Sequence, residues 1–119
     1  MKLWRLFIYK PLVRDAVIKR FEYTFELCWK TSKVFLSEKF GVDIFSPKQC
    51  FRELRKNKLL SDKETETLLQ ETDDRNQIIH AYGQDFSNEL YEKINGNYYQ
   101  LLEKIYRILE NKNLKVEKL

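Results

Sequence analysis

Nine residues, from Asp74 to Tyr82, hold the side chains of this chain best suited to acid–base chemistry on a phosphodiester. His80 is the only histidine of the chain, and Arg75 and Asn76 precede it by about one helical turn. On an α-helix Asn76 and His80 share a face, whereas Arg75 lies roughly 140° away and needs its long side chain to reach the imidazole. A proton-transfer group, a fixed cation and an amide donor could together act on a phosphodiester. The alternative is a helix end with a capping cluster and no chemistry.

Length and composition indicate one helical domain. The chain has 119 residues, 43% of them hydrophobic and 34% charged, with three glycines and two prolines. This is enough to bury a single core without metals or disulfides. The net charge is +4, but acids and bases alternate along the chain, so no basic field covers the domain. Nucleic-acid binding is therefore permitted and not required.

The cysteines and the N-terminal apolar run bear on metals, redox state and membranes. Cys28 and Cys50 are far apart in the sequence, and with one histidine they cannot form a zinc site without several carboxylates. We therefore expect no metal and no cofactor, and reduced thiols in a cytoplasmic protein. The apolar run at 3–9, which ends before Pro11, is too short to span a bilayer, and no small-residue cleavage site follows it.

A long helix is predicted from about residue 14 to residue 40, ended by Gly41. One stripe along it comprises Val17, Phe21, Thr24, Cys28, Ser32 and Phe35, widened by Ile18 and Phe25. A second apolar stripe, well away from the first, comprises Tyr23, Leu27 and Val34. A helix that is apolar on two sides is central in a bundle or shared with another subunit, so we expect a homodimer. The preceding residues, 1–13, form either a helical turn or an extended arm, which Pro11 separates from the long helix.

A capping box from Ser46 to Gln49, with Pro47 at the first helical position, predicts a short helix to about Asn57. Its basic side chains lie on one side of the helix: Lys48, Arg52, Arg55 and Lys56. Such a basic stripe is usually a solvated face. The functional alternative is a surface that binds the phosphates of RNA or of a nucleotide.

Two further helices complete an all-α, antiparallel up-and-down bundle of about four helices in a single domain, 1–119. A second capping box at 61–64 starts the third helix, which is expected to run to Tyr82 with Gly83 as its C-terminal cap. The expected inner face of this helix comprises Leu68, Leu69, Thr72, Asn76 and Ile79. Ser87 is expected to cap a fourth helix that runs to about residue 111. Residues 95–97 resemble a turn and weaken this helix locally, but the apolar spacing continues through them, so we expect a single helix.

Two stretches of the chain resemble one family. Residues 14–30 (Arg-Asp-Ala-Val-Ile-Lys-Arg-Phe-Glu-Tyr-Thr-Phe-Glu-Leu-Cys-Trp-Lys) resemble the opening of the nucleotidyltransferase substrate-binding protein family, which belongs to the HEPN superfamily of small helical bundles. The order Arg75, four residues, His80, one residue, Tyr82 is similar to the signature of that family. The resemblance covers roughly residues 14–108. Members usually carry a full amphipathic helix before this opening, so here either the start is truncated or residues 4–9 replace that helix.

The resemblance implies two functions. Some HEPN proteins are metal-independent ribonucleases, often toxins, whose arginine and histidine come from two subunits and meet across a dimer. Others are substrate-binding partners of a separately encoded minimal nucleotidyltransferase, which in toxin pairs acts as the antitoxin by transferring AMP to the motif tyrosine. The first function makes this chain a ribonuclease of single-stranded RNA, silenced by AMP transfer to Tyr82.

In that ribonuclease His80 is the general acid or base for attack by the 2′-hydroxyl, Arg75 stabilises the charged phosphorane, and Asn76 is a positioning donor. The second function makes the chain a noncatalytic subunit that uses the same residues to contact a nucleotide phosphate or the partner protein. A third interpretation gives them no function: Arg75 pairs with Asp73 or Asp74, and His80 caps the helix end.

Overall fold

The protein, described here by a computed structural model, is a bundle of helices. The structure describes residues 3–78 and 83–112, with side chains from residue 9 onward. Within these residues every regular element is helical, which confirms the all-α prediction. The elements are α1 (Leu3–Phe40), α2 (Pro47–Lys56), α3 (Asp62–Ile78), α4 (Gln84–Lys93), the π-helical turn η1 (Ile94–Tyr98) and α5 (Tyr99–Asn111).

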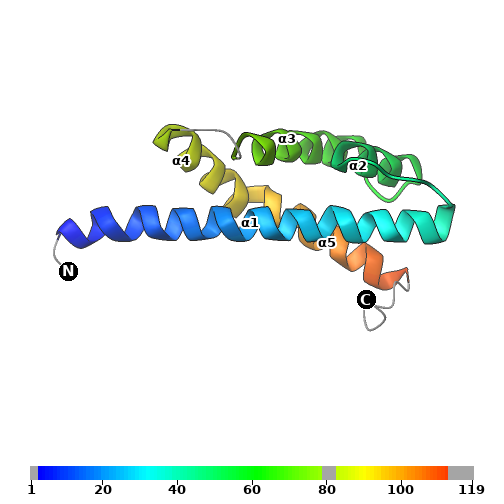
Figure 1. The fold of residues 1–119 in the computed structure, drawn as a ribbon, viewed down its shortest axis with the longest axis horizontal. Helices are drawn as coiled ribbons and strands as arrows, with labels where there is room; N and C mark the ends of the chain where they lie inside the picture. Colours follow the sequence, from blue (N-terminus) through cyan, green and yellow to red (C-terminus); the bar gives the residue numbers. More distant parts are fainter. Residues whose placement is uncertain (1–2, 79–82, 113–119) are drawn as a thin grey trace.

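Helix α1 is the long axis of the molecule, and its N-terminal end extends past the other helices (Figure 1). Helices α2 and α3 pack against each other, and α2 packs against the C-terminal half of α1. The rod formed by α4, η1 and α5 crosses α1, so that α4 and α5 contact it on either side of the crossing point. No helix in the described part of the chain is both long enough and apolar enough to cross a membrane.

Aromatic side chains of α1 form the centre of the core. Phe21 and Phe25 have no exposed surface, and their ring centroids lie 6.0 Å apart. Phe21 stacks on Tyr98 of η1 at 5.9 Å, and Phe25 meets Phe51 of α2 edge-on at 5.8 Å. These contacts fasten one face of α1 to the rest of the bundle.

Helix α1 is longer than the sequence predicted because it continues through Pro11. Proline removes one backbone hydrogen bond and disfavours a helix interior by about 3 kcal/mol. Packing opposes that penalty, since α1 contacts α4, and Arg14 reaches Asn88 of α4 with an Nη1–Oδ1 distance of 3.2 Å. The expected separation at Pro11 is therefore wrong.

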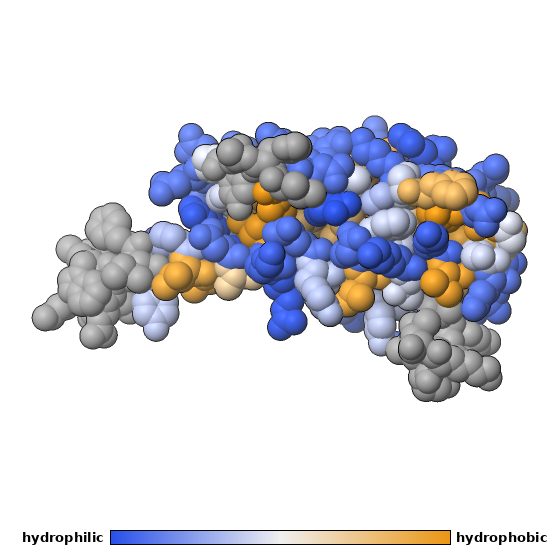
Figure 2. Space-filling view, in the orientation of Figure 1, coloured by the Kyte–Doolittle hydropathy of each residue, from blue (hydrophilic) through white to orange (hydrophobic). Residues whose placement is uncertain are grey.

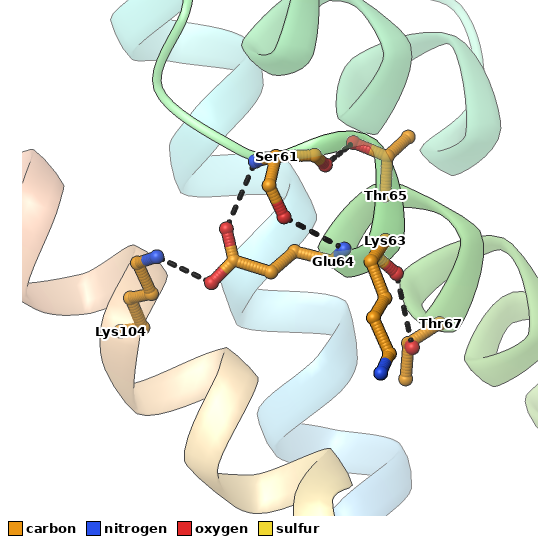
Figure 3. A network of polar contacts seen from close by, with 6 residues as sticks. All are labelled: Ser61, Lys63, Glu64, Thr65, Thr67 and Lys104. Atoms are coloured by element: carbon orange, nitrogen blue, oxygen red, sulfur yellow. Dashed lines mark hydrogen bonds and ion pairs between the residues drawn. The ribbon is translucent and has the colours of Figure 1, made fainter.

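Local signals correctly mark most helix ends. Gly41 adopts a left-handed φ of 65° directly after α1, and its N–H donates to the carbonyl of Ser37 at 3.0 Å. In the capping box of α3, the Glu64 N–H donates to Ser61 Oγ at 3.1 Å, and the Ser61 N–H donates to Glu64 Oε1 at 2.9 Å (Figure 3). Lys104 of α5 pairs with the same carboxylate and links the two helices.

The capping box of α2 differs in one bond. The Gln49 N–H donates to Ser46 Oγ at 3.2 Å, but Gln49 Oε1 accepts from the Phe45 N–H at 2.7 Å, one residue earlier than in the usual pattern.

Two predicted caps of the later helices are wrong. Gly83 precedes α4 in an extended conformation (φ −91°, ψ 176°) and is the N-cap residue of that helix. Helix α4 therefore begins before Ser87, which is buried in the first turn with its N–H donating to the Gly83 carbonyl at 3.2 Å.

The turn-like residues 95–97 lie in η1, where the helix widens into a π-turn without stopping.

Candidate functional site

The last turn of α3 is held by consecutive charged residues that bind different elements, because successive helical positions differ by 100°. Asp73 pairs with Lys48 of α2 at 2.6 Å. The buried Asp74 accepts a hydrogen bond from the Tyr98 hydroxyl of η1 at 2.6 Å and an ion pair from Lys93 of α4 at 3.2 Å. Burial and this hydrogen bond raise the pKa of Tyr98 above its ordinary value, so the phenol stays a donor.

Arg75, the third of these charged residues, binds α1. Its Nη1 lies 3.3 Å from Glu26 Oε2, and its Cζ lies 5.0 Å from the ring centroid of Phe25. The side chain is 18% exposed, and its buried Nε has no hydrogen-bond partner among the described residues. The expected pairing of Arg75 with Asp73 or Asp74 is therefore wrong, because each of those carboxylates faces another element.

Glu26 is the acceptor that holds Arg75 in place. Its Oε2 also accepts from Trp29 Nε1 at 3.1 Å, and its Oε1 pairs with Lys30 at 3.1 Å. Partial burial raises the pKa of Glu26, but the hydrogen bonds from Trp29 and Lys30 and the charge of Arg75 outweigh it, so the pKa is lowered overall. The carboxylate is therefore charged at neutral pH and fixes the guanidinium at the edge of the bundle.

The other residues predicted for this site have different outcomes. Asn76 is exposed and does not lie on the inner face of α3, where Glu71 and Asp74 are buried instead. His80 and Tyr82 lie outside the described residues, so their predicted roles stay predictions.

The basic stripe of α2 is largely paired with acids. Besides the Lys48–Asp73 pair, Arg55 lies 3.5 Å from Asp62, and Lys56 lies 3.9 Å from Glu53. Arg52 is exposed and makes no ion pair with any residue that the structure describes. These ion pairs at the surface are weak and can open, so they do not prevent the basic side chains from binding phosphate. The role of the stripe as a phosphate-binding surface stays a prediction.

A buried carboxyl lies near the site and was not predicted. Glu71 of α3 has no exposed surface, and neither of its side-chain oxygens has a hydrogen-bond partner within the described part of the chain. Burial, joined by the charge of Asp74, raises the pKa of Glu71 to about 9. We conclude that Glu71 is protonated at neutral pH.

The two thiols, Cys28 and Cys50, are free, and burial raises the pKa of Cys50 to about 12.

The burial of Glu71 could have been predicted from its position among the apolar positions of α3. The buried side of α3 includes residues at helical spacing: Leu68, Glu71, Thr72 and Ile78. An acidic residue at one of these positions is therefore expected to be buried. Glu26 gave no comparable signal, because its i, i+4 pair with Lys30 is typical of any exposed helix.

Comparisons with known proteins agree with this structure. The family described as nucleotidyltransferase substrate binding protein like matches residues 5–111. A solved structure, the crystal structure of ttk003001694 from Thermus thermophilus, is 37% identical to this chain. It superposes with a TM-score of 0.79, covering 83% of this chain and 82% of that chain. No curated protein matched the sequence significantly.

Proposed function

The chain belongs to the nucleotidyltransferase substrate binding protein like family, and we propose that it is the cytoplasmic partner subunit of a separately encoded nucleotidyltransferase. In this proposal Arg75 binds a phosphate of the nucleotide or RNA on which the pair acts. The observation that carries it is the fixed guanidinium at the edge of the bundle, held by Glu26 and Phe25.

The contacts of Arg75 suit an anion-binding role. A guanidinium carries five N–H donors, and Glu26 accepts from Nη1 only. The Cζ atom of the guanidinium lies over the ring of Phe25, a contact that uses none of its donors. Because Nε is buried, the donors left for a phosphate are those on the two Nη nitrogens that Glu26 does not use, and these can form the paired hydrogen bonds by which arginine recognises phosphate.

The proposal is tested by titrating ATP and a single-stranded RNA oligonucleotide into the complex of this protein with its nucleotidyltransferase. Arg75→Ala should weaken binding roughly tenfold to a hundredfold, the value of a charge-assisted hydrogen bond. The matched control is Arg107→Ala, which removes an exposed arginine of α5 paired within its own helix to Glu103. Equal affinity of the Arg75 variant and the control, with both folded by circular dichroism, would contradict the proposal.

A second candidate function is a metal-independent ribonuclease, and the spacing from Arg75 through His80 to Tyr82 favours it. His80 would move the proton of the RNA 2′-hydroxyl, Arg75 would stabilise the phosphorane, and Asn76 would orient the phosphate. The site would be composite, with Arg75 and His80 contributed across a homodimer. The basic side chains of α2 would bind flanking phosphates: Lys48, Arg52, Arg55 and Lys56.

This candidate is tested by incubating the purified protein with single-stranded RNA and EDTA. His80→Ala and Arg75→Ala should each abolish cleavage without unfolding the protein. Cleavage that survives both substitutions would show that the activity belongs to another site or to a contaminant.

Silencing of such a ribonuclease would act through Tyr82. The phenol oxygen would attack the α-phosphorus of ATP, diphosphate would leave, and the phenolic proton would pass to solvent or a base. The AMP added would place an anion near Arg75 and exclude RNA. With the nucleotidyltransferase, ATP and magnesium, mass spectrometry should locate AMP on Tyr82. Equal modification of Tyr82→Phe would refute this switch.

A further inference from the structure

A cavity lies between the N-terminal part of α1 and helix α4, and Arg75 is not among the residues that line it. Its volume is about 650 Å³, which is within the range of pockets that bind small molecules. Near its N-terminal end α1 presents hydrophobic and hydrophilic side chains next to each other (Figure 2). We call this site the α1–α4 cavity, and its polar and aromatic lining comprises Tyr9, Lys10 and Arg14 of α1 and Gln84, Asn88, Tyr91 and Glu92 of α4.

The α1 wall of the cavity offers two cations. Lys10 and Arg14 are four residues apart and therefore share a face of the helix. The Arg14 side chain is only 14% exposed, and its Nε donates to Asp15 Oδ1 at 3.0 Å. Its Nη1 donates to Asn88 Oδ1 at 3.2 Å, so three of the five N–H donors of the guanidinium are left for a ligand. Because Asp15 is well exposed, its ion pair is weak and leaves the wall attractive to an anion.

The α4 wall offers hydrogen-bond donors and an acceptor. Gln84, Asn88, Tyr91 and Glu92 follow one another at spacings of four, three and one, so they lie on one side of α4. Since Asn88 Oδ1 already accepts from Arg14, the donors on its Nδ2 are left for a ligand. The carboxylate of Glu92 is an acceptor, so this wall presents a donor next to an acceptor, as the edge of a nucleobase requires.

A tyrosine ring lies on each wall. Tyr9 of α1 is 62% exposed, and Tyr91 of α4 is half-buried. Aromatic side chains bind nucleobases by stacking on their faces, and this contact tolerates any base. The cavity therefore combines the groups that recognise a phosphate, the face of a base and the edge of a base.

We propose that the α1–α4 cavity binds a nucleotide whose base carries an exocyclic amino group. The phosphate binds Lys10 and Arg14, the base stacks on tyrosine, and Glu92 accepts a hydrogen bond from the amino group. Adenine, cytosine and guanine carry such a group, whereas uracil presents a carbonyl oxygen, which a carboxylate repels. An acidic peptide fits less well, because Glu92 would repel it and the tyrosine rings would have no flat partner.

The position of the cavity relative to Arg75 connects it with the candidate site. Arg14 and Phe25 are eleven residues apart in α1, which places them within about 20° of each other and about 17 Å apart along the helix axis. The guanidinium of Arg75 lies over the ring of Phe25. A single-stranded RNA lying along this face of α1 would contact both arginines, whereas a free nucleotide would occupy the cavity alone. The inference rests on the proposed function only for the RNA strand.

The first test is fluorescence anisotropy with a labelled short oligo(A) RNA. Lys10→Ala and Tyr9→Ala should each raise the dissociation constant about tenfold, the value of a charge-assisted hydrogen bond or of one stacked base. Both side chains are exposed, so neither variant loses core packing. The matched controls are Lys19→Ala and Phe45→Ala, which remove exposed side chains outside the cavity. Equal affinity of the cavity variants and these controls would overturn the proposal.

The salt dependence of the same binding separates the phosphate contact from the base contact. Loss of one phosphate contact to a single strand should reduce the slope of log K against log salt by about 0.7. Lys10→Ala should show this reduction, and Tyr9→Ala should keep the slope of wild type. A reduction in Tyr9→Ala as large as in Lys10→Ala would contradict the assignment of the phosphate to the α1 wall.

The base preference is tested by comparing oligo(A) with oligo(U). Wild type should bind oligo(A) about tenfold more tightly, the value of one hydrogen bond to a charged group. Glu92→Gln should reduce this ratio, because an amide can also donate to the carbonyl oxygen of uracil. Glu89→Gln, an exposed change on α4 outside the cavity, should keep it. Equal binding of the two RNAs by wild type, or an unchanged ratio in Glu92→Gln, would refute the role of Glu92.

Competition distinguishes the two sources of the nucleotide. Displacement of labelled oligo(A) by AMP assigns the cavity to a free nucleotide, and displacement by unlabelled oligo(A) alone assigns it to a strand. In the Arg75→Ala background Lys10→Ala should still weaken binding, and loss of that effect would show that the cavity has no affinity of its own. Failure of the proposed function has a different sign, namely equal binding by Arg75→Ala and Arg107→Ala.

Discussion

Replacing Glu71 by glutamine should flatten the pH dependence of the stability of this domain between pH 5 and pH 8. Glu71 has no exposed surface, its two carboxyl oxygens lack hydrogen-bond partners among the described residues, and its pKa is raised to about 9. In the unfolded chain the same carboxyl titrates near its ordinary value of 4.5. Folding therefore takes up a proton at any pH between these two values.

The sign and the size follow from this proton uptake. The stability contributed by the neutral acid is fully present below pH 4.5 and is lost as the pH rises toward 9. The loss is about 1.4 kcal/mol per pH unit, so the three units from pH 5 to pH 8 remove about 4 kcal/mol. Domains of this size are stable by about 5–15 kcal/mol, so the change is easily measured.

The assay is urea unfolding followed by circular dichroism at pH 5, 6, 7 and 8. Glu71→Gln keeps the size of the side chain and removes its titration, while every other group titrates in both proteins. Glu66→Gln is the control, because Glu66 is exposed on the same helix. Wild type should lose stability relative to Glu71→Gln as the pH rises, and Glu66→Gln should follow wild type.

The absolute stability of Glu71→Gln is not diagnostic, because a buried amide also lacks partners and has its own cost. The diagnostic quantity is the difference in slope. Parallel curves for wild type and Glu71→Gln would refute the conclusion that Glu71 is buried in its neutral form.

Three further predictions concern the scaffold and are checked by the same urea unfolding at pH 7. Tyr98→Phe removes the 2.6 Å hydrogen bond to the buried Asp74 and should cost about 1–3 kcal/mol; no change would show that the other two donors to this carboxylate, Gln70 and Lys93, satisfy it without the phenol. Gly41→Ala strains a φ of 65° and should cost about 1 kcal/mol, whereas Gly96→Ala, in a helical turn with open space, should stabilise by up to about 1 kcal/mol. Ser61→Ala removes a helix cap and should cost about 1 kcal/mol.

Interactions between near neighbours in the chain could be predicted from its residues. The caps at Ser46 and Ser61 and the end of α1 at Gly41 were predicted correctly because each depends on hydrogen bonds between residues at most four positions apart. The two apolar faces of α1 were also predicted, because helical periodicity places side chains on faces whatever surrounds them. Residues 14–30, together with the order Arg75, His80, Tyr82, pointed to the family, because such a resemblance depends on the order of residues and not on contacts between helices.

Contacts between helices, in contrast, became known only from the packed bundle. Arg75 meets Glu26 across 49 residues, and Asp74 meets Tyr98 across 24, so neither partner could be identified from helical spacing. Gly83 was expected to end one helix and instead begins the next. Periodicity defines the faces of each helix, but the angle at which two helices cross determines which faces meet. That angle depends on side chains distant in the sequence, such as those that fasten Phe21 and Phe25 to the rest of the core.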